Sequence, residues 1–345
     1  MVVLFHLMTI EQKYGGDSIL PGIMSVGLGG VDLFFVISGF VMTTILQGKF
    51  GKLLNAKRFL LRRLTRIYPM YWIYTFIVLA VFLFKPNWVN SSGGGKFKLI
   101  HSVFLLPSTT LPVLIVGWSL IFEIYFYLVL TLLIFLPQRW YKSALVFWAI
   151  SIALGSFIYS ESPSPIVQLL ISPLSLEFIV GCCIALVLSR QGNRTLPFSE
   201  SQKKRLFLLF QFGIFFSFIF LITSYGLYKK HTGLIFPEDW IRILIFGLPA
   251  GLVLTSLVCI EKMHGWRMPK ILIIIGDASY SIYLSHILVM SALGRIWNAF
   301  HFGGYYNNLV ALPLIFVGSI LTGWVSYIIL EKPILNWTHR MLKLK

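Results

Sequence analysis

The feature that most constrains this chain is a recurring apolar stretch long enough to cross a lipid bilayer. A helix rises about 1.5 Å per residue, so about 17 to 25 apolar residues cover a hydrocarbon core of roughly 30 Å. Nine stretches of about that length occur, at residues 27–47, 69–84, 113–136, 143–160, 170–189, 206–228, 241–260, 271–292 and 309–330. With 57% hydrophobic and only 12% charged residues, the chain is expected to fold as an all-α, polytopic transmembrane helical bundle.

A tenth apolar stretch, residues 1–10, is too short to cross a membrane. We therefore expect about ten helices, of which the first is incomplete at its start. The loops between the apolar stretches are short, which predicts a single membrane domain over residues 1–345 and no C-terminal soluble domain.

The basic residues alternate between the two sides of the predicted bundle. The loops 49–66, 137–142, 189–205, 261–270 and 331–345 hold 21 of the 29 Lys and Arg residues, and the alternate loops hold 7. Because cytoplasmic loops carry the excess of Lys and Arg, we expect the C-terminus in the cytoplasm. The same pattern accounts for the net charge of +17 without a nucleic-acid partner, since these residues fall in short loops between apolar stretches.

Several classes of enzyme lack their motifs here. The chain has no GxSxG, HExxH, GxGxxG or Walker motif, which argues against a serine hydrolase, a zinc protease and a nucleotide hydrolase. Cys182, Cys183 and Cys259 lie in apolar stretches without CxxC spacing. We therefore expect neither a disulfide framework nor a metal site.

Five of the ionisable side chains in the apolar stretches are candidates for function. They come from five different predicted helices and are His6, Asp32, Glu123, Glu177 and His286. On the expected topology all five lie within roughly 15 Å of the outer face. An ionisable group inside a membrane costs free energy unless it faces a partner or a wet cavity. Their common depth therefore predicts one polar cavity, used for catalysis or for transport.

A cluster of three arginines, Arg62, Arg63 and Arg66, precedes the second long apolar stretch. If residues 59–67 are helical and Pro69 opens the next span, Arg62 and Arg66 lie one turn apart on one face. Guanidinium groups bind phosphate oxygens in pairs, so the cluster suits a phosphate-bearing substrate in the cytoplasm. The alternative is an anchor to anionic lipid headgroups.

Six short motifs appear in order along the whole chain. They are Gly30-Val-Asp-Leu-Phe-Phe-Val-Ile-Ser-Gly-Phe40, Arg62-Arg-Leu-Thr-Arg-Ile-Tyr-Pro69, Trp118-Ser-Leu-Ile-Phe-Glu-Ile-Tyr-Phe-Tyr127, Glu177-Phe-Ile-Val-Gly181, Ser279-Tyr-Ser-Ile-Tyr-Leu-Ser-His286 and Glu331-Lys-Pro333. Together they resemble the acyltransferase 3 family of integral membrane O-acyltransferases.

This resemblance implies a ten-helix domain in the cell membrane. It implies transfer of an acyl group, often acetyl, from cytoplasmic acyl-CoA to a hydroxyl of a surface polysaccharide or lipid-linked glycan. Acyl-CoA would be a donor substrate and not a permanently bound cofactor, and membrane lipid would surround the protein. In the family, helix one carries an arginine upstream of a functional histidine. His6 fits the histidine, and the arginine position precedes Met1.

Acyl transfer to a hydroxyl needs a base near that hydroxyl, and His6 is our candidate. Imidazole has an ordinary pKa near 6.5, so it accepts a proton at neutral pH. Asp32 or Glu123 would orient the imidazole, and depth slightly favours Asp32. The alternative for His6 is a structural histidine at the membrane interface. Direct transfer is the preferred mechanism, although Ser38 and Ser119 keep a covalent intermediate open.

Three further residues are candidates for substrate binding. Trp118, near Glu123, would stack on a sugar, or it simply packs among the neighbouring aromatic residues. His286 would act as a second proton-transfer group or bind the acceptor. The alternative is a structural role, in which its side chain forms a hydrogen bond between two helices. Glu177 would line the cavity or pair with a neighbouring helix. Glu331 is interpreted as a structural element at the end of the last helix.

A different class of function stays open on the sequence alone. Acids and histidines inside a membrane also serve proton-coupled transport, so the alternative is a transporter or flippase of a lipid-linked sugar or small anion. A third, weaker hypothesis is a non-catalytic member of the family that serves as a partner or regulator.

Overall fold

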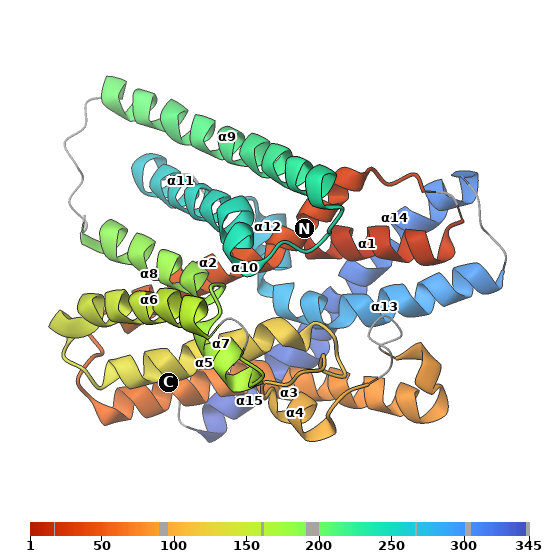
Figure 1. Ribbon diagram of the computed structural model, residues 1–345, viewed down its shortest axis with the longest axis horizontal. Helices are drawn as coiled ribbons and strands as arrows, with labels where there is room; N and C mark the ends of the chain where they lie inside the picture. Colours follow the sequence, from red (N-terminus) through yellow and green to blue (C-terminus); the bar gives the residue numbers. More distant parts are fainter. Residues whose placement is uncertain are drawn as a thin grey trace. The chain divides into compact units, whose positions relative to one another are not determined.

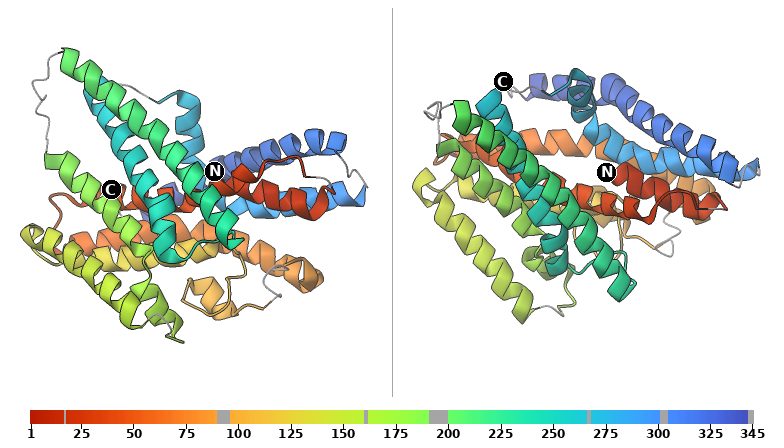
Figure 2. Two further views of the ribbon diagram at one scale, coloured as in Figure 1. Left: turned by 45° about the horizontal axis from the view of Figure 1, so that its top comes forward. Right: turned by 90° about the horizontal axis from the view of Figure 1, so that it is seen from above.

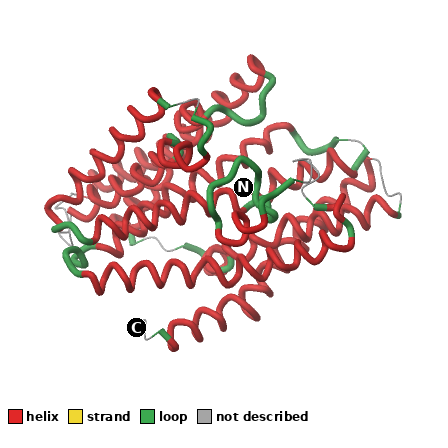
Figure 3. The backbone as a smooth tube through the Cα atoms, turned by 60° about the horizontal axis from the view of Figure 1, so that its bottom comes forward, coloured by secondary structure: helices red, strands yellow, loops and turns green. Residues whose placement is uncertain are grey.

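The structure is a computed structural model that describes residues 1–16, 18–89, 96–159, 162–190, 200–265, 268–300 and 305–342. Every regular element in those ranges is a helix (Figures 1 and 3). The elements are α1 (Val2–Tyr14), η1 (Gly22–Gly29), α2 (Gly30–Leu46), α3 (Leu53–Phe84), η2 (Pro86–Trp88), α4 (Leu99–Phe104), α5 (Gly117–Ile134), η4 (Gln138–Trp140), α6 (Tyr141–Ile158), α7 (Pro165–Ile171), α8 (Ser175–Arg190), α9 (Glu200–Thr232), α10 (Asp239–Arg242), η5 (Ile243–Gly247), α11 (Leu248–His264), α12 (Lys270–Asp277), α13 (Ser279–Ala299), α14 (Tyr305–Ser326), η6 (Tyr327–Glu331) and α15 (Lys332–Met341).

The described residues contain eight helical segments long and apolar enough to cross a membrane, and the bent pair α12 and α13 would make a ninth. The eight segments are Gly22–Leu46, Leu53–Phe84, Gly117–Ile134, Gln138–Ile158, Pro165–Leu188, Lys204–Thr232, Asp239–Met263 and Asn307–Met341. Each of the nine predicted stretches falls on one of these segments or on the bent pair. The prediction of an all-α polytopic bundle is confirmed.

The stretch 271–292, predicted as one span, is a bent pair of helices in the structure. α12 and α13 meet at 69° around Ala278, which belongs to neither helix. Apolar residues continue on both sides, so hydropathy does not reveal the break. Asp277 and Ser279 flank it, and such residues favour helix ends because their side chains compete for backbone hydrogen bonds.

α3 begins at Leu53 and runs unbroken to Phe84, so it includes most of the segment 49–66 that was expected to connect two spans. Residues 59–67 are helical, as predicted. Pro69 lies inside α3 and does not open a new helix. Proline is tolerated inside membrane helices where neighbouring groups satisfy the freed backbone. The three arginines therefore lie on the same continuous helix as the apolar stretch 69–84.

The described residues form two compact units, each assembled from separate parts of the chain. Unit 1 comprises Met1–Gly27, Leu53–Leu132 and Lys270–Lys345, and unit 2 comprises Leu28–Lys52 and Leu133–Pro269. The predicted single domain over residues 1–345 stays a prediction.

In unit 1, α13 packs against both α1 and α14 (Figure 2). The core of this contact is a cluster of large apolar side chains, Leu7, Met290, Trp297, Leu312 and Ile315. α1 runs parallel to α13, since His6 lies beside His286 and Tyr14 lies against Gly294. The packing of α1 against α13 thus brings the histidines of the two helices together.

α3 and α5 lie side by side in unit 1 and run antiparallel. The Phe59 and Tyr127 rings are 6.0 Å apart, and further along α3 the Tyr71 side chain meets Gly117 at the start of α5. The hydroxyl of Tyr71 also donates to the Ser102 carbonyl oxygen at 2.5 Å, which ties α4 to α3. This pairing sets the arginine-bearing part of α3 beside the middle of α5.

In unit 2, α2 and α8 approach so closely that their backbones touch. A Cβ atom at Gly39 would lie 1.9 Å from the Phe178 carbonyl oxygen, and one at Gly181 would lie 1.9 Å from the Val36 carbonyl oxygen. Small residues permit this approach in membrane helices. α2 and α8 each carry one acid, Asp32 and Glu177.

Candidate active site

The first feature of the candidate site is a pair of histidines in unit 1. The ring centroids of His6 on α1 and His286 on α13 are 5.1 Å apart, with the rings tilted by 49°. His286 is completely buried, and its Nδ1 lies 3.1 Å from the Ile282 carbonyl oxygen. Only a protonated Nδ1 can donate to that oxygen, so Nε2 carries the lone pair. Nε2 is buried and has no hydrogen-bond partner among the described residues.

The histidine pair is linked to α5 through Tyr283. The Tyr283 and His286 ring centroids are 5.9 Å apart on the same helix. The Tyr283 hydroxyl lies 2.6 Å from Ser119 Oγ and 3.0 Å from the Val116 carbonyl oxygen. Tyr283 therefore fixes α13 to the first turn of α5.

Glu123 lies one helical turn beyond Ser119 on α5 and is buried. Its Oε1 accepts a hydrogen bond from the Tyr127 hydroxyl at 2.5 Å. Arg63 and Arg66 of α3 lie within electrostatic range of this carboxyl group. Glu123 therefore lies on the side of α5 that faces Arg63 and Arg66 of α3. Its predicted depth near the outer face did not indicate these neighbours.

The arginine cluster faces aromatic and acidic groups of unit 1. The Arg63 guanidinium lies 6.0 Å from the centre of the Tyr127 ring. The Arg66 guanidinium lies 5.6 Å from the Tyr280 ring of α13 and forms an ion pair with Glu331. The Tyr280 hydroxyl donates to the Ile67 carbonyl oxygen at 2.7 Å, so α13 also contacts the α3 backbone.

Glu331 does not end a helix, which corrects its interpretation as a terminal element. It is completely buried in the wide helical turn η6, which continues directly into α15. One oxygen binds Arg66 and the other accepts a hydrogen bond from Ser281 Oγ at 2.6 Å. Since the carboxylate binds side chains of α3 and α13, it orients Arg66 within the site.

Trp118 lies in the first turn of α5, next to Ser119. Its ring packs edge to face against Phe122, with the ring centroids 6.2 Å apart. The indole is partly exposed, so it retains a surface for further contacts. Both the packing role and the sugar-binding role remain compatible with this position.

In unit 2, Asp32 is bound by a residue that the sequence analysis left unassigned. Arg242 of α10 donates through Nε to Asp32 Oδ1 at 2.7 Å and through a terminal nitrogen to Oδ2 at 2.9 Å. Both side chains are buried. Arg242 stands at the edge of an apolar stretch, as Asp32 does, and a charge in that setting requires an opposite partner. That signal could have identified the pair.

Glu177 of α8 is buried within electrostatic range of Asp32 and Arg242. Its two carboxyl oxygens have no hydrogen-bond partner among the described residues. A Cβ atom at Gly247 would lie 2.9 Å from Glu177 Oε1, so this glycine leaves the room that the carboxyl group occupies. Asp239 lies nearby and accepts a hydrogen bond from Ser172 at 2.7 Å.

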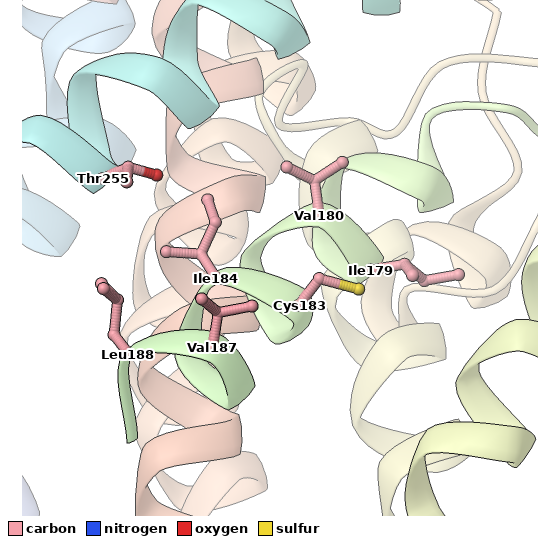
Figure 4. A pocket seen from close by; sticks show the side chains of 7 residues that line it. All are labelled: Ile179, Val180, Cys183, Ile184, Val187, Leu188 and Thr255. Carbon is pink, nitrogen blue, oxygen red and sulfur yellow. The ribbon is translucent and has the colours of Figure 1, made fainter. Parts of the chain in front are cut away.

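Unit 2 also contains an apolar pocket of about 380 Å³ between α8 and α11 (Figure 4). It is lined by Ile179, Val180, Cys183, Ile184, Val187, Leu188 and Thr255. This lining contains no acid, histidine or arginine. Within the described residues, no group of three or more His, Cys, Asp or Glu side chains could hold a metal ion.

The predicted site residues therefore fall into two sets. His6, His286, Trp118, Glu123 and the three arginines belong to unit 1, and Asp32 and Glu177 belong to unit 2. Convergence of the five ionisable residues on one cavity stays a prediction, as do their catalytic roles. Both oxygens of Asp32 already bind Arg242, a contact that the proposed pairing of Asp32 with His6 did not include.

Comparison with known proteins decides the family. Residues 1–328 match the profile of acyltransferase family 3, described as an acyltransferase domain. The chain belongs to the acyltransferase 3 family. With at least eight apolar helices, it is a multi-pass membrane protein and an acyltransferase. No solved structure matches the chain.

Three curated relatives show the extent of the similarity. The exopolysaccharide production protein ExoZ of Rhizobium meliloti is 28% identical over 90% of both chains. The peptidoglycan O-acetyltransferase OatA of Listeria monocytogenes is 26% identical over 77% of this chain and 45% of its own length. A putative O-acetyltransferase of Staphylococcus aureus, SACOL0978, is 26% identical over 90% of this chain and 54% of its own. The chain thus spans about half of the two O-acetyltransferases.

Proposed function

We propose that this protein moves an acetyl group from acyl-CoA on the cytoplasmic side to a hydroxyl of a surface polysaccharide or lipid-linked glycan. One observation carries the proposal. Within unit 1, Tyr283, Ser119 and Glu123 form a series of polar side chains between the histidine pair and the arginine cluster. A base and a phosphate-binding group thus belong to one compact part of the protein.

The arginine cluster provides the donor side of the site. Phosphate oxygens bind guanidinium groups in pairs, and the phosphates of coenzyme A present several such oxygens. Glu331 holds Arg66 in a fixed direction, which lowers the entropy lost when a phosphate binds. Arg62 and Arg63 extend this basic surface along α3.

The histidine pair provides the acceptor side. His6 removes the proton from the acceptor hydroxyl while its oxygen attacks the thioester carbonyl carbon. When the tetrahedral intermediate collapses, the carbon–sulfur bond breaks and the proton returns to the leaving sulfur, so that an ester and a free thiol result. The Ser119 hydroxyl is already bonded to Tyr283, which favours direct transfer over a serine-bound intermediate.

The relatives support the choice of substrates. One is named for exopolysaccharide production and another for O-acetylation of peptidoglycan, so both names refer to glycans. The alternation of Lys and Arg along the chain supports a cytoplasmic position for the C-terminus and for the arginine-bearing end of α3, on the side where acyl-CoA is found.

Deletion and complementation of the gene test this function. Loss of the gene should remove alkali-labile acetyl esters from the surface glycan, and the wild-type gene should restore them. Arg63→Gln should reduce the restored acetyl content at least about tenfold, because a charge-assisted phosphate contact is lost. Arg58→Gln is the matched control, since Arg58 is exposed on the same helix. An unchanged acetyl content after deletion would contradict the proposal.

A further inference from the structure

We infer that His286, and not a carboxylate, orients His6 and accepts a hydrogen bond from its imidazolium during acyl transfer. The inference rests on the proposed function, because it assigns a positioning residue to the same reaction. It starts from the buried Nε2 of His286, which has a lone pair and no hydrogen-bond partner among the described residues. A buried acceptor without a donor costs free energy, so each such group in a protein calls for an explanation.

The tautomer of His286 is fixed by the backbone. Its Nδ1 can only donate to the Ile282 carbonyl oxygen, at 3.1 Å, which leaves Nε2 as an acceptor. This hydrogen bond joins two residues of one helical turn, so it does not depend on contacts between helices. His286 therefore presents a lone pair and not an N–H group.

The orientation of the His286 ring is fixed from a second side. The Tyr283 ring lies 5.9 Å from it, and the Tyr283 hydroxyl is held by Ser119 and the Val116 carbonyl oxygen. Two independent contacts thus hold the imidazole while the His6 ring lies 5.1 Å away. A fixed acceptor beside a base is the arrangement that orients the histidine in hydrolytic triads.

The carboxylates that could serve this role have other partners. Both oxygens of Asp32 accept hydrogen bonds from Arg242. Glu123 accepts a hydrogen bond from Tyr127 and lies within range of two arginines. The ring beside His6 belongs instead to His286.

The proton can be followed through the step. His6 is neutral at first and takes the proton of the acceptor hydroxyl as the oxygen–acyl bond forms. The resulting imidazolium has two N–H groups, of which one faces the forming ester and the other donates to His286 Nε2. When the carbon–sulfur bond breaks, the first proton passes to the sulfur and His6 becomes neutral again. His286 keeps its own proton on Nδ1 throughout.

Three substitutions at position 286 test the inference, using purified full-length protein with labelled acetyl-CoA and a soluble glycan acceptor. The amide oxygen of His286→Gln reaches the position of Nε2, so this variant should keep kcat within about tenfold of the wild type. His286→Asn can reach only the position of Nδ1, and His286→Phe has no acceptor. Both should lose at least about 100-fold in kcat with KM for acetyl-CoA unchanged.

The outcomes separate this inference from the proposed function. If the wild-type protein transfers no acetyl group, the proposed function fails, and the inference fails with it. If the wild type is active and His6→Ala is inactive, but His286→Phe keeps its kcat, the inference alone is wrong. Equal losses in His286→Gln and His286→Asn would also overturn it, since they would indicate a role in folding. Elution of each variant as a folded monodisperse protein is the control for stability.

Discussion

Substitution of Asp32 by asparagine leaves the Arg242 guanidinium without its carboxylate inside unit 2. The pair consists of two charged hydrogen bonds, of 2.7 and 2.9 Å, between side chains that are 0% and 7% exposed. Removal of one partner of a buried ion pair costs about 3 to 5 kcal/mol, because an uncompensated charge stays buried. Glu177 lies near Arg242 and should offset part of this cost. We therefore expect Asp32→Asn to lower the free energy of unfolding by about 3 kcal/mol.

The double variant Asp32→Asn with Arg242→Gln separates the ion pair from its surroundings. Two neutral amides remain, and replacement of both charges at once avoids the buried unpaired cation. The double variant should therefore be more stable than the sum of the two single effects predicts, by at least about 1 kcal/mol. A loss of 1 kcal/mol of stability lowers the melting temperature by about 2 to 4 °C. Asp32→Asn should therefore melt several degrees below the wild type.

Thermal unfolding in detergent, followed by the fraction of protein that stays monodisperse after heating, measures these differences. Glu238→Gln is the matched control, because Glu238 is an exposed acid beside α10 and its loss should leave the melting temperature unchanged. Single variants as stable as the wild type would refute the reasoning. Strictly additive single and double effects would refute it as well, because they would show that the two charges do not interact.

Two further predictions concern packing and the link between helices. Gly181→Ala should abolish recovery of folded protein, because its Cβ would lie 1.9 Å from the Val36 carbonyl oxygen. Gly226→Ala is the control: its Cβ would meet no atom within 4 Å, so this variant should be recovered normally. Recovery of both variants in equal amounts would contradict the close packing of α2 and α8. Tyr283→Phe removes the hydroxyl bonded to Ser119 and should lower acetyl transfer about fivefold, the value of one hydrogen bond, with folded yield unchanged. Unchanged transfer would mean that this link does not position the site.

The sequence predicts the membrane helices well, because the length of an apolar stretch is a direct consequence of bilayer thickness. It does not predict the bend at Ala278, since apolar residues continue through it and only the weak preferences of Asp277 and Ser279 mark it. Nor does it predict that α3 includes Pro69, because that depends on neighbouring helices which satisfy the freed backbone.

The candidate site is predictable as a set of residues but not as a set of contacts. His6 and Glu123 are marked by their position in apolar stretches. Their partners depend on which helices adjoin, and hydropathy does not contain that information. His286 lies beside His6 because α1 packs against α13, and Arg242 reaches Asp32 from a helix more than two hundred residues later in the chain.

Sealed inside-out membrane vesicles provide the most direct test of acetyl transfer across the membrane. Labelled acetyl-CoA added outside such vesicles has access to the cytoplasmic face only, and the glycan acceptor is enclosed in the lumen. We predict that label accumulates in the lumen as an alkali-labile ester of the glycan, and that His6→Ala and Arg63→Gln prevent this. Absence of the labelled ester, together with proton-gradient-dependent passage of an unmodified lipid-linked sugar, would contradict the account and indicate a transporter.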